Sequence, residues 1–350
     1  MVWIKRILKG LAVLGIVVAF VLLALISAIF IMEKGPSETA KVLFVQTVRE
    51  FAWGKEDGPL GFIPTMFLSK EEVREIVARG SMDDDIDDGT SSDTSKIDID
   101  DDIVQDIQII DISEGSYKAK LMIVADPSKV FMGVVPEFFY GQGQKVDEMI
   151  ERYEAMGYNL VGGVNGGDFI DNGMNNSYTA MPLGAVMSEG QLYELSGPAE
   201  DYYYLSGFTK DNKFVMIKTS SIEQALEEVD YRDFVYTKHD TGPFLVMDGV
   251  ALVNEVPGTA VYGGGKNPRT AIGQRADGAV LLLAVDGRQA NSLGATFVEL
   301  ANIMLKYGAV NACAMDGGTS TQMFYHGELI SNPYSAYGVR RCPTAWLVKE

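Results

Sequence analysis

The segment AVLLLAVDGRQANSLGATFVELANIMLKYGAVNACAMDGG, residues 279–318, decides the fold. Residues 279–285 are apolar throughout and predict a buried strand. Thr296 and Glu299 have the spacing of a capping box, which predicts that a helix begins here and continues to the next glycine. Residues 310–315 predict a second apolar strand. The segment is therefore predicted to be a strand–helix–strand unit.

Each predicted strand ends on an Asp-Gly turn, at Asp286 and Asp316. A crossover between two strands of one sheet makes them parallel, so both aspartates should lie at the edge where α/β sheets bind ligands. Neighbouring strands lie about 4.8 Å apart, which predicts carboxylates roughly 5 to 10 Å from one another. This separation suits paired acid–base chemistry on a sugar. The alternative is that each Asp-Gly is simply a turn.

Residues around the two turns favour binding of an anion. In Gly317-Gly318-Thr319-Ser320-Thr321, consecutive backbone N–H groups and adjacent hydroxyls could cradle an anion. Arg269 precedes a further predicted strand, and Arg288 follows the first Asp-Gly turn. Guanidinium groups bind phosphate through a bidentate fork, so both arginines are candidate phosphate ligands. An ordinary ion pair with one of the aspartates is the alternative for either arginine.

The rest of the body alternates strand and helix signals without an internal repeat. We predict an α/β (α+β) fold, in which a mixed β-sheet is flanked by helices, and one main globular domain over residues 105–350. Its other predicted strands are 160–164, 183–187, 213–218 and 244–247, and its other helices are 144–156 and a short one near 221–228.

The N-terminus has the pattern of a membrane anchor. Lys5, Arg6 and Lys9 precede an uncharged run over residues 10–32, which as a helix reaches roughly 34 Å. A cleaved signal peptide is the alternative, but its apolar core usually has about 7 to 15 residues. We therefore predict a cytoplasmic basic tail at 1–9, a single-pass signal anchor at 10–32 and an extracytoplasmic remainder.

Two segments separate this anchor from the body. Residues 33–80 are predicted to form a stalk with a short helix, which begins at the capping box of Ser69 and ends at Gly80. Residues 81–104 are predicted to be an acidic, flexible segment. The run from Asp83 resembles a calcium-binding loop, but its glycine and its final ligand do not fit the EF-hand register.

Composition excludes several kinds of protein. The net charge of -19 disfavours a nucleic-acid partner. The two histidines, His239 and His326, exclude any site that needs three histidines.

Cys313 and Cys342 could form a disulfide outside the cytoplasm or remain as buried free thiols, and the sequence leaves both readings open. We predict no required cofactor and no protein-bound metal, although a divalent cation is left open.

A series of motifs over about residues 105–349 resembles the phosphodiester glycosidase family. These motifs, in chain order, are Asn165-Gly166-Gly167-Asp168-Phe169, Pro182-Leu183-Gly184, Gly242-Pro243, Asn267-Pro268-Arg269-Thr270-Ala271, Val285-Asp286-Gly287-Arg288, Gly294-Ala295-Thr296 and Met315-Asp316-Gly317-Gly318. Asp168 and Thr241 depart from the family pattern, which bears on substrate choice more than on the type of reaction.

The resemblance implies hydrolysis of a sugar 1-phosphodiester to the free sugar and a phosphomonoester. By motif, Arg269 and Arg288 would bind the phosphate, Asp286 and Asp316 would be the catalytic carboxylates, and Asn165 would orient the substrate. Residues of the glycine-rich turn, namely Gly317, Gly318, Ser320 and Thr321, would complete the binding site. The expected partner is a phosphodiester-linked glycan of a cell envelope or exopolysaccharide, with the membrane reached through the N-terminal helix.

Two other classes of function remain open at this point. A metal-assisted phosphodiesterase would use Asp286 and Asp316 as metal ligands and would cut at phosphorus. A non-catalytic module would bind anionic glycopolymers without turnover. The sequence does not identify the sugar, the oligomeric state, the source organism, or which aspartate acts as the acid.

Overall fold

The computed structural model describes residues 2–50, 56, 58–78, 86–99, 106–170, 178–194, 202–238, 242–253, 265–332, 335 and 338–350. The chain divides into two compact units. One comprises Met1–Gly80 and Val256–Gly265, and the other comprises Ser81–Glu255 and Lys266–Glu350, which we call the body.

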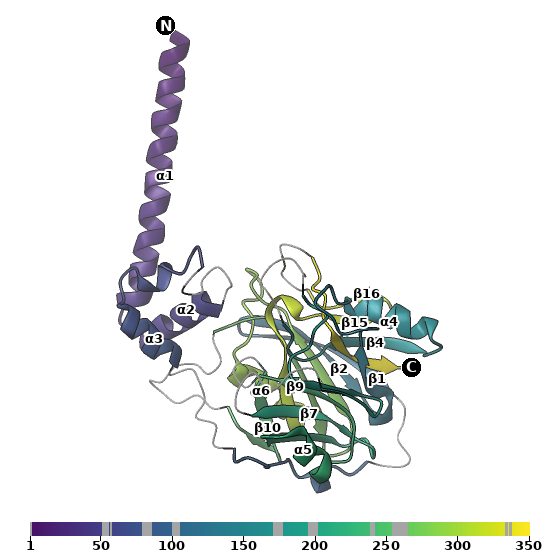
Figure 1. Ribbon diagram of the computed structural model, residues 1–350. Helices are drawn as coiled ribbons and strands as arrows, with labels where there is room; N and C mark the ends of the chain where they lie inside the picture. Colours follow the sequence, from purple (N-terminus) through teal and green to yellow (C-terminus); the bar gives the residue numbers. More distant parts are fainter. Residues whose placement is uncertain are drawn as a thin grey trace. The chain divides into compact units, whose positions relative to one another are not determined.

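The smaller unit is helical. Its helix α1 (Val2–Lys34) contains an apolar stretch, Val13–Lys34, with a mean hydropathy of 3.1, which is long enough to cross a membrane or to act as a signal sequence. The helices that follow, drawn in dark blue in Figure 1, are α2 (Glu38–Glu50), η1 (Ile63–Thr65) and α3 (Lys70–Ala78).

The segment predicted as a stalk contains a small core. Val42 and Val45 of α2 pack with Leu68, and with Val73 and Ile76 of α3. The predicted capping box is present at the start of α3: the backbone N–H of Glu72 donates to Ser69 Oγ, and the Glu72 carboxylate accepts from the Ser69 N–H. This part of the chain is therefore a packed helical unit.

The body has three antiparallel sheets, which confirms the α+β class (Figure 1). The seven-stranded sheet has the order β1 (Ile107–Glu114), β2 (Tyr117–Val124), β13 (Val280–Val285), β12 (Arg269–Arg275), β14 (Ala309–Met315), β10 (Phe244–Met247) and β11 (Val250–Ala251). A five-stranded sheet has the order β16 (Glu328–Leu329), β15 (Met323–Tyr325), β4 (Leu160–Asn165), β17 (Thr344–Lys349) and β3 (Val130–Val134). The third has the order β6 (Gln191–Glu194), β5 (Ala185–Ser188), β9 (Tyr231–Thr237), β7 (Tyr203–Thr209) and β8 (Phe214–Thr219).

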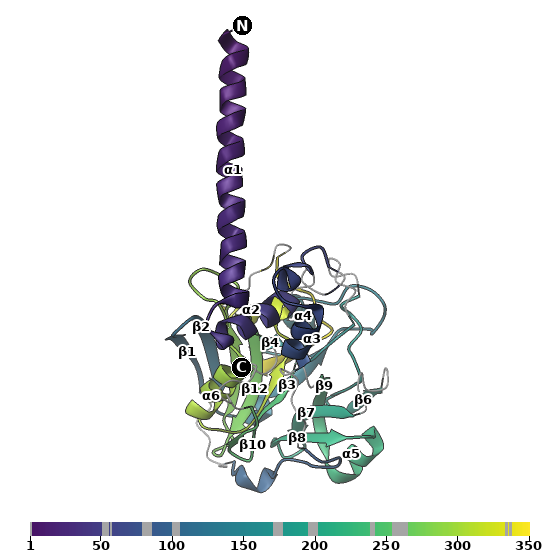
Figure 2. The same ribbon diagram turned by 90° about the vertical axis from the view of Figure 1, so that its left-hand side faces the viewer.

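One apolar core joins the three sheets. It includes Leu282 and Ile272 from the first sheet, Trp346 from the second, and Phe208 and Phe214 from the third. Helices cover the outer sides of central strands: α4 (Val146–Ala155) packs on β4, α5 (Ile222–Glu228) on β8, and α6 (Phe297–Lys306) on β14 and β10. Figure 2 shows α5 beside β7 and β8, and α6 beside β12. Short 3-10 turns complete the elements at η2 (Thr94–Lys96), η3 (Pro127–Lys129) and η4 (Gly318–Ser320).

The predicted adjacency of the two apolar strands is wrong. β13 and β14 are not neighbours, because β12 lies between them and pairs antiparallel with each. The two strands are still parallel to one another, so both still end at the same edge of the sheet. The open parallel arrangement expected of an α/β fold is replaced by antiparallel pairing throughout the described strands.

The described part of the acidic segment, residues 86–99, lies along the body. The backbone N–H of Gly89 donates to Lys218 O at 2.9 Å, and Ser92 N donates to Met216 O at 2.9 Å, both on β8. Ile97 is buried. These contacts contrast with the flexible linker that the charge of the segment predicts. Asp83 and the next two aspartates of the calcium-like run lie outside the described residues, as do His239 and Thr241.

Cys313 and Cys342 are both free and buried, so the disulfide reading is wrong for this structure. Cys313 lies on β14, and its Sγ donates to Gly242 O at 3.6 Å. Cys342 Sγ donates to Gln144 O at 3.5 Å. Burial raises the pKa of each thiol to about 12, which leaves almost no reactive thiolate at neutral pH.

Alkylation should distinguish these buried thiols from a disulfide. Without any reductant, iodoacetamide should leave Cys313 and Cys342 unmodified in the folded protein and should modify both after denaturation in guanidinium. Intact-mass measurement before and after denaturation checks this. A protein that stays unmodified when denatured, and gains two labels only after reduction, would contain the bridge.

Candidate active site

The site residues on the large sheet come from three neighbouring strand ends. Arg269 begins β12 and pairs with Val285, the last residue of β13. The next residue of β12, Thr270, pairs with Met315, the last residue of β14. Because β12 runs opposite to both neighbours, its first residues meet their last ones. The Asp286 turn, Arg269 and the Asp316 turn are thus brought to one edge.

Asn165 connects this edge to the second sheet. The residue ends β4 and is completely buried. Its Nδ2 donates to Asp316 O at 2.7 Å, while its Oδ1 accepts from Thr270 Oγ1 at 2.8 Å and from the Gln322 N–H at 3.2 Å. The Asp316 N–H in turn donates to Gly166 O at 3.2 Å. The Asn165 amide is therefore engaged by protein groups and fixes the Asp316 turn.

Arg288 lies beside the glycine-rich turn. Its backbone is in the left-handed region, with φ at 58°, within the turn that follows Asp286. Its Nε and Nη2 donate to Asn267 Oδ1 at 3.2 and 3.1 Å. A Cβ built on Gly318 would lie 3.3 Å from Arg288 Nη2, so the guanidinium approaches this turn closely. A side chain at Gly318, whose φ is 61°, would be strained and would crowd the arginine.

Arg269 lies beneath the same turn. The side chain is buried, its guanidinium carbon is 3.8 Å from the centre of the Phe297 ring, and its Nε donates to Ala295 O at 3.3 Å. A Cβ built on Gly317 would be 3.7 Å from Arg269 Cδ. Both arginines therefore border the Gly317-Gly318 turn, which directly follows Asp316.

Asp286 is partly buried and has a raised pKa. Desolvation by burial raises the pKa of this carboxyl, against the lowering effects of an Asn332 N–H donor and of Lys120 and Lys118. The Asn332 N–H donates to Asp286 Oδ1 at 2.7 Å. Burial thus favours the protonated form of this carboxyl relative to an exposed aspartate, which suits a proton donor.

The glycine-rich turn is closed on its inner side and open on its outer side. Asp316 and the next three residues are partly exposed, whereas Ser320 and Thr321 are buried. Thr321 Oγ1 has no solvent access and no hydrogen-bond partner among the described groups. The Gly318 N–H donates to Pro268 O at 2.8 Å, so the protein itself uses one of the amides expected to cradle an anion.

The structure adds three residues that the sequence did not single out. Asn267 holds Arg288 through its side-chain oxygen, Asn332 donates to Asp286, and Arg340 Nη1 donates to Thr319 Oγ1 at 3.3 Å. Asn267 directly precedes Pro268 and Arg269, so its place beside a candidate phosphate ligand was a signal that could have identified it as a site residue. The other two come from the loop before β17, where no local pattern marks them.

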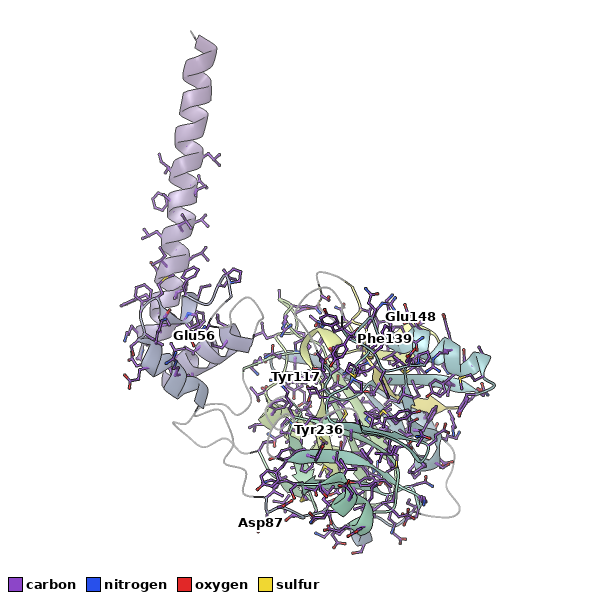
Figure 3. The ribbon with its side chains drawn as sticks, viewed as in Figure 1. Glu56, Asp87, Tyr117, Phe139, Glu148 and Tyr236 are labelled. Atoms are coloured by element: carbon purple, nitrogen blue, oxygen red, sulfur yellow. The ribbon has the colours of Figure 1, made fainter. Side chains whose placement is uncertain are left out.

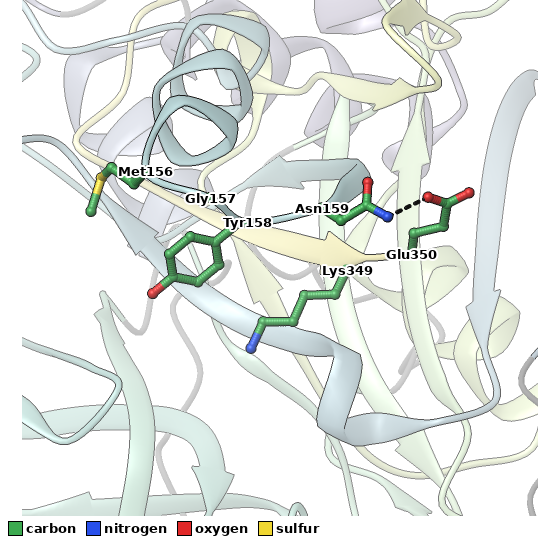
Figure 4. A pocket seen from close by; sticks show the side chains of 6 residues that line it. All are labelled: Met156, Gly157, Tyr158, Asn159, Lys349 and Glu350. Carbon is green, nitrogen blue, oxygen red and sulfur yellow. Dashed lines mark hydrogen bonds between the residues drawn. The ribbon is translucent and has the colours of Figure 1, made fainter.

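Other features of the described residues do not compete with this edge. A shallow surface depression lies at the opposite strand ends, lined by Met156, Gly157, Tyr158, Asn159, Lys349 and Glu350 (Figure 4). No group of three or more His, Cys, Asp or Glu residues in the described part of the chain could hold a metal ion.

Comparison with known proteins identifies relatives of the body. The model of the phosphodiester glycosidase family matches residues 158–349. The SPbeta prophage-derived uncharacterized protein YomE of Bacillus subtilis (strain 168) is 43% identical over 67 residues, which cover 19% of this chain and 10% of that protein. N-acetylglucosamine-1-phosphodiester alpha-N-acetylglucosaminidase of Mus musculus is 27% identical over 233 residues, covering 63% of this chain and 42% of the mouse enzyme.

A solved structure shares the fold. It is the catalytic domain of zebrafish N-acetylglucosamine-1-phosphodiester alpha-N-acetylglucosaminidase, auto-inhibited by its pro-peptide. The TM-score is 0.54 at 21% sequence identity, with 75% of this chain and 88% of that chain covered. The chain spans less than half the length of the curated relatives named above.

The raised pKa of Asp286 predicts a pH-dependent gain in stability for Asp286→Asn. Below the pKa of the unfolded chain, about 3.9, the carboxyl is protonated in both states and the substitution should be nearly neutral. As the pH rises toward the higher folded pKa, the wild type loses stability because its buried carboxyl resists ionisation. The Asn variant should then be the more stable protein at pH 7.

Urea unfolding at several values between pH 3.5 and pH 7 measures this difference. Asp277→Asn, at an exposed turn on the opposite edge, is the matched control and should change little. A wild type that gains stability over Asp286→Asn as the pH rises would show that the pKa of Asp286 is lowered.

Proposed function

Since the chain belongs to the phosphodiester glycosidase family, whose model matches more than half of its length, we propose that it hydrolyses a sugar 1-phosphodiester at the glycosidic bond. The products would be the free sugar and a phosphomonoester. The mouse relative, named as acting on an N-acetylglucosamine 1-phosphodiester, supports this class of substrate.

The observation that carries the proposal is the meeting of two arginines and two aspartates at one edge. Arg269 and Arg288 border the Gly317-Gly318 turn. Asp286 and Asp316 follow strands that are separated by one intervening strand, so their backbones lie about 10 Å apart, two strand spacings. The sugar and its phosphate would lie over this edge, where the arginines would neutralise the phosphate charge.

We assign different roles to the two aspartates. Asp286, whose pKa is raised by burial, would protonate the oxygen that bridges the anomeric carbon and phosphorus. The bond from the anomeric carbon to this oxygen would break, and the phosphomonoester would leave. Asp316 would stabilise the oxocarbenium-like state and accept a proton from the water that adds to the anomeric carbon.

The buried members of the site would position these groups. Both the nitrogen and the oxygen of the Asn165 amide are hydrogen-bonded to protein groups. We therefore propose that Asn165 holds the Asp316 turn in place rather than touching the substrate. Ser320 and Thr321 are buried and would shape the turn from below. Gly317 and Gly318 would allow the phosphate to approach the arginines without a side chain in the way.

The N-terminal helix suggests where the enzyme works. We propose that α1 remains as a single-pass anchor, with Lys5, Arg6 and Lys9 on the cytoplasmic side and the body outside. Residues 10–32 would cross the membrane, and 105–350 would form the catalytic domain. An enzyme placed there would act on phosphodiesters of cell-envelope or exopolysaccharide glycans.

Loss of one arginine or one aspartate should remove turnover. Arg269→Ala and Asp316→Asn should each lower kcat/KM for a synthetic sugar 1-phosphodiester by at least about 100-fold, because each removes a charge that the transition state needs. Arg269→Lys should retain part of the activity. Near-wild-type activity in Arg269→Ala or Asp316→Asn would show that this site assignment is wrong.

Folding and metal dependence are checked in the same experiment. Circular dichroism and thermal melting should show that the variants fold, and exposed Asp277→Asn is the matched carboxylate control. Activity should be unchanged after dialysis against EDTA, because we propose no required metal. Activity that disappears on chelation and returns with a divalent cation would favour a metal-assisted phosphodiesterase.

A further inference from the structure

Three exposed aromatic side chains gather at one place on the body. Phe139, Tyr140 and Tyr178 are 47%, 69% and 38% exposed. The other exposed large apolar side chains among the described residues of the body are aliphatic or methionine, and they are scattered over different elements: Met156, Val250, Leu293 and Leu329. Exposed aromatic surface in the described part of the body is therefore concentrated in this cluster, which we call the aromatic platform.

The platform is held by contacts between two segments. The Phe139 ring lies against Gly141, where an added Cβ would approach the ring to 2.0 Å, so a side chain at this position would displace the ring. The Ala180 N–H donates to Gly141 O at 3.0 Å and joins the second segment to the first. The rings of Tyr140 and Tyr178 meet edge to face, with centroids 6.1 Å apart. The two segments thus hold Tyr140 and Tyr178 side by side.

The platform lies at the same edge as the candidate active site. It follows β3, whose last residue, Val134, pairs with Thr344 at the start of β17. The next residue of β17, Ala345, pairs with Asn165 at the end of β4. The ends of β3 and β4 therefore lie together, and Figure 3 marks Phe139 on this part of the body.

A short chain of contacts leads from the platform to the glycine-rich turn. The loop that carries the aromatic residues continues to Gln144, which exchanges backbone hydrogen bonds with Cys342 at 3.1 and 2.8 Å. Two residues earlier, Arg340 donates to Thr319 Oγ1, and its guanidinium carbon lies 5.6 Å from the centre of the Phe169 ring. The platform is thus connected through Arg340 to the turn that follows Asp316.

We propose that the aromatic platform binds sugar rings of the substrate beyond the ring whose bond is cleaved. This inference rests on the proposed function. The C–H groups on one face of a pyranose ring carry partial positive charge and pack against the negative face of an aromatic ring. The hydroxyls of Tyr140 and Tyr178 can donate to or accept from sugar hydroxyls at its rim. The ligand is therefore a neutral stretch of glycan next to the anionic phosphodiester.

The size of the platform favours a glycan over a protein partner. At these exposures the three side chains offer on the order of 300 Å² of surface. A stable protein interface uses about 800 Å² on each partner. A small exposed apolar patch of this kind can mark a ligand-binding surface.

Extended and short substrates should separate the platform from the reaction centre. The short substrate is a monosaccharide 1-phosphate esterified with methanol. One extended substrate replaces the monosaccharide with the matching hexasaccharide. The other keeps the monosaccharide and replaces the methyl group with a hexasaccharide. In Tyr140→Ala/Tyr178→Ala, kcat/KM should fall about tenfold on an extended substrate, mainly through KM, and should stay unchanged on the short one. Tyr140→Phe/Tyr178→Phe keeps the rings and should retain most of the effect.

A binding measurement distinguishes failure of this inference from failure of the proposed function. Saturation-transfer NMR with neutral chitohexaose and maltohexaose needs no turnover. At least one sugar should receive saturation from the wild type and lose it in the double alanine variant. Val250→Ala, an exposed side chain on the β10–β11 hairpin at the opposite edge, should behave as wild type.

The outcomes are decisive for the platform. Equal kinetic losses on short and extended substrates would show that the tyrosines act on the reaction centre instead. Unchanged kinetics and unchanged saturation in the double alanine variant would overturn the proposal. If the wild type hydrolyses no phosphodiester but binds the hexasaccharide through these residues, the proposed reaction fails and the sugar platform stands.

Discussion

The whole site depends on the pairing of β12 with β13 on one side and β14 on the other. An antiparallel strand between two parallel ones brings its own beginning to the place where its neighbours end. Arg269 therefore emerges between the turns that carry Asp286 and Asp316. A shift of β12 by one residue would turn Arg269 to the other face of the sheet and separate it from the glycine-rich turn.

A second constraint fixes these strand ends relative to the other sheet that contributes to the site. The buried amide of Asn165 is hydrogen-bonded to the Asp316 carbonyl, to Thr270 and to the Gln322 N–H. A buried amide with satisfied donors and acceptors contributes to rigidity, whereas removal of one partner leaves a buried polar atom without a hydrogen bond and lowers stability. The charges are consequently held on strand ends with little freedom, as a preorganised electrostatic site requires.

Local patterns were sufficient for much of this account. The apolar runs that became β13 and β14 and the capping box of Thr296 and Glu299 all formed as predicted. The position of β12 could not be predicted, because it depends on pairing between strands distant in sequence, and its polar ends give a weak strand signal. The partner of Asp286 was missed for the same reason: Asn332 comes close to it only through tertiary packing.

The central claim is that the two aspartates and two arginines direct cleavage to the bond between the anomeric carbon and oxygen. Hydrolysis of a sugar 1-phosphodiester in water enriched with ¹⁸O tests it most directly, with mass spectrometry of both products at early times. We predict the label in the released sugar and none in the phosphomonoester. Label in the phosphomonoester would mean attack at phosphorus and would contradict the account.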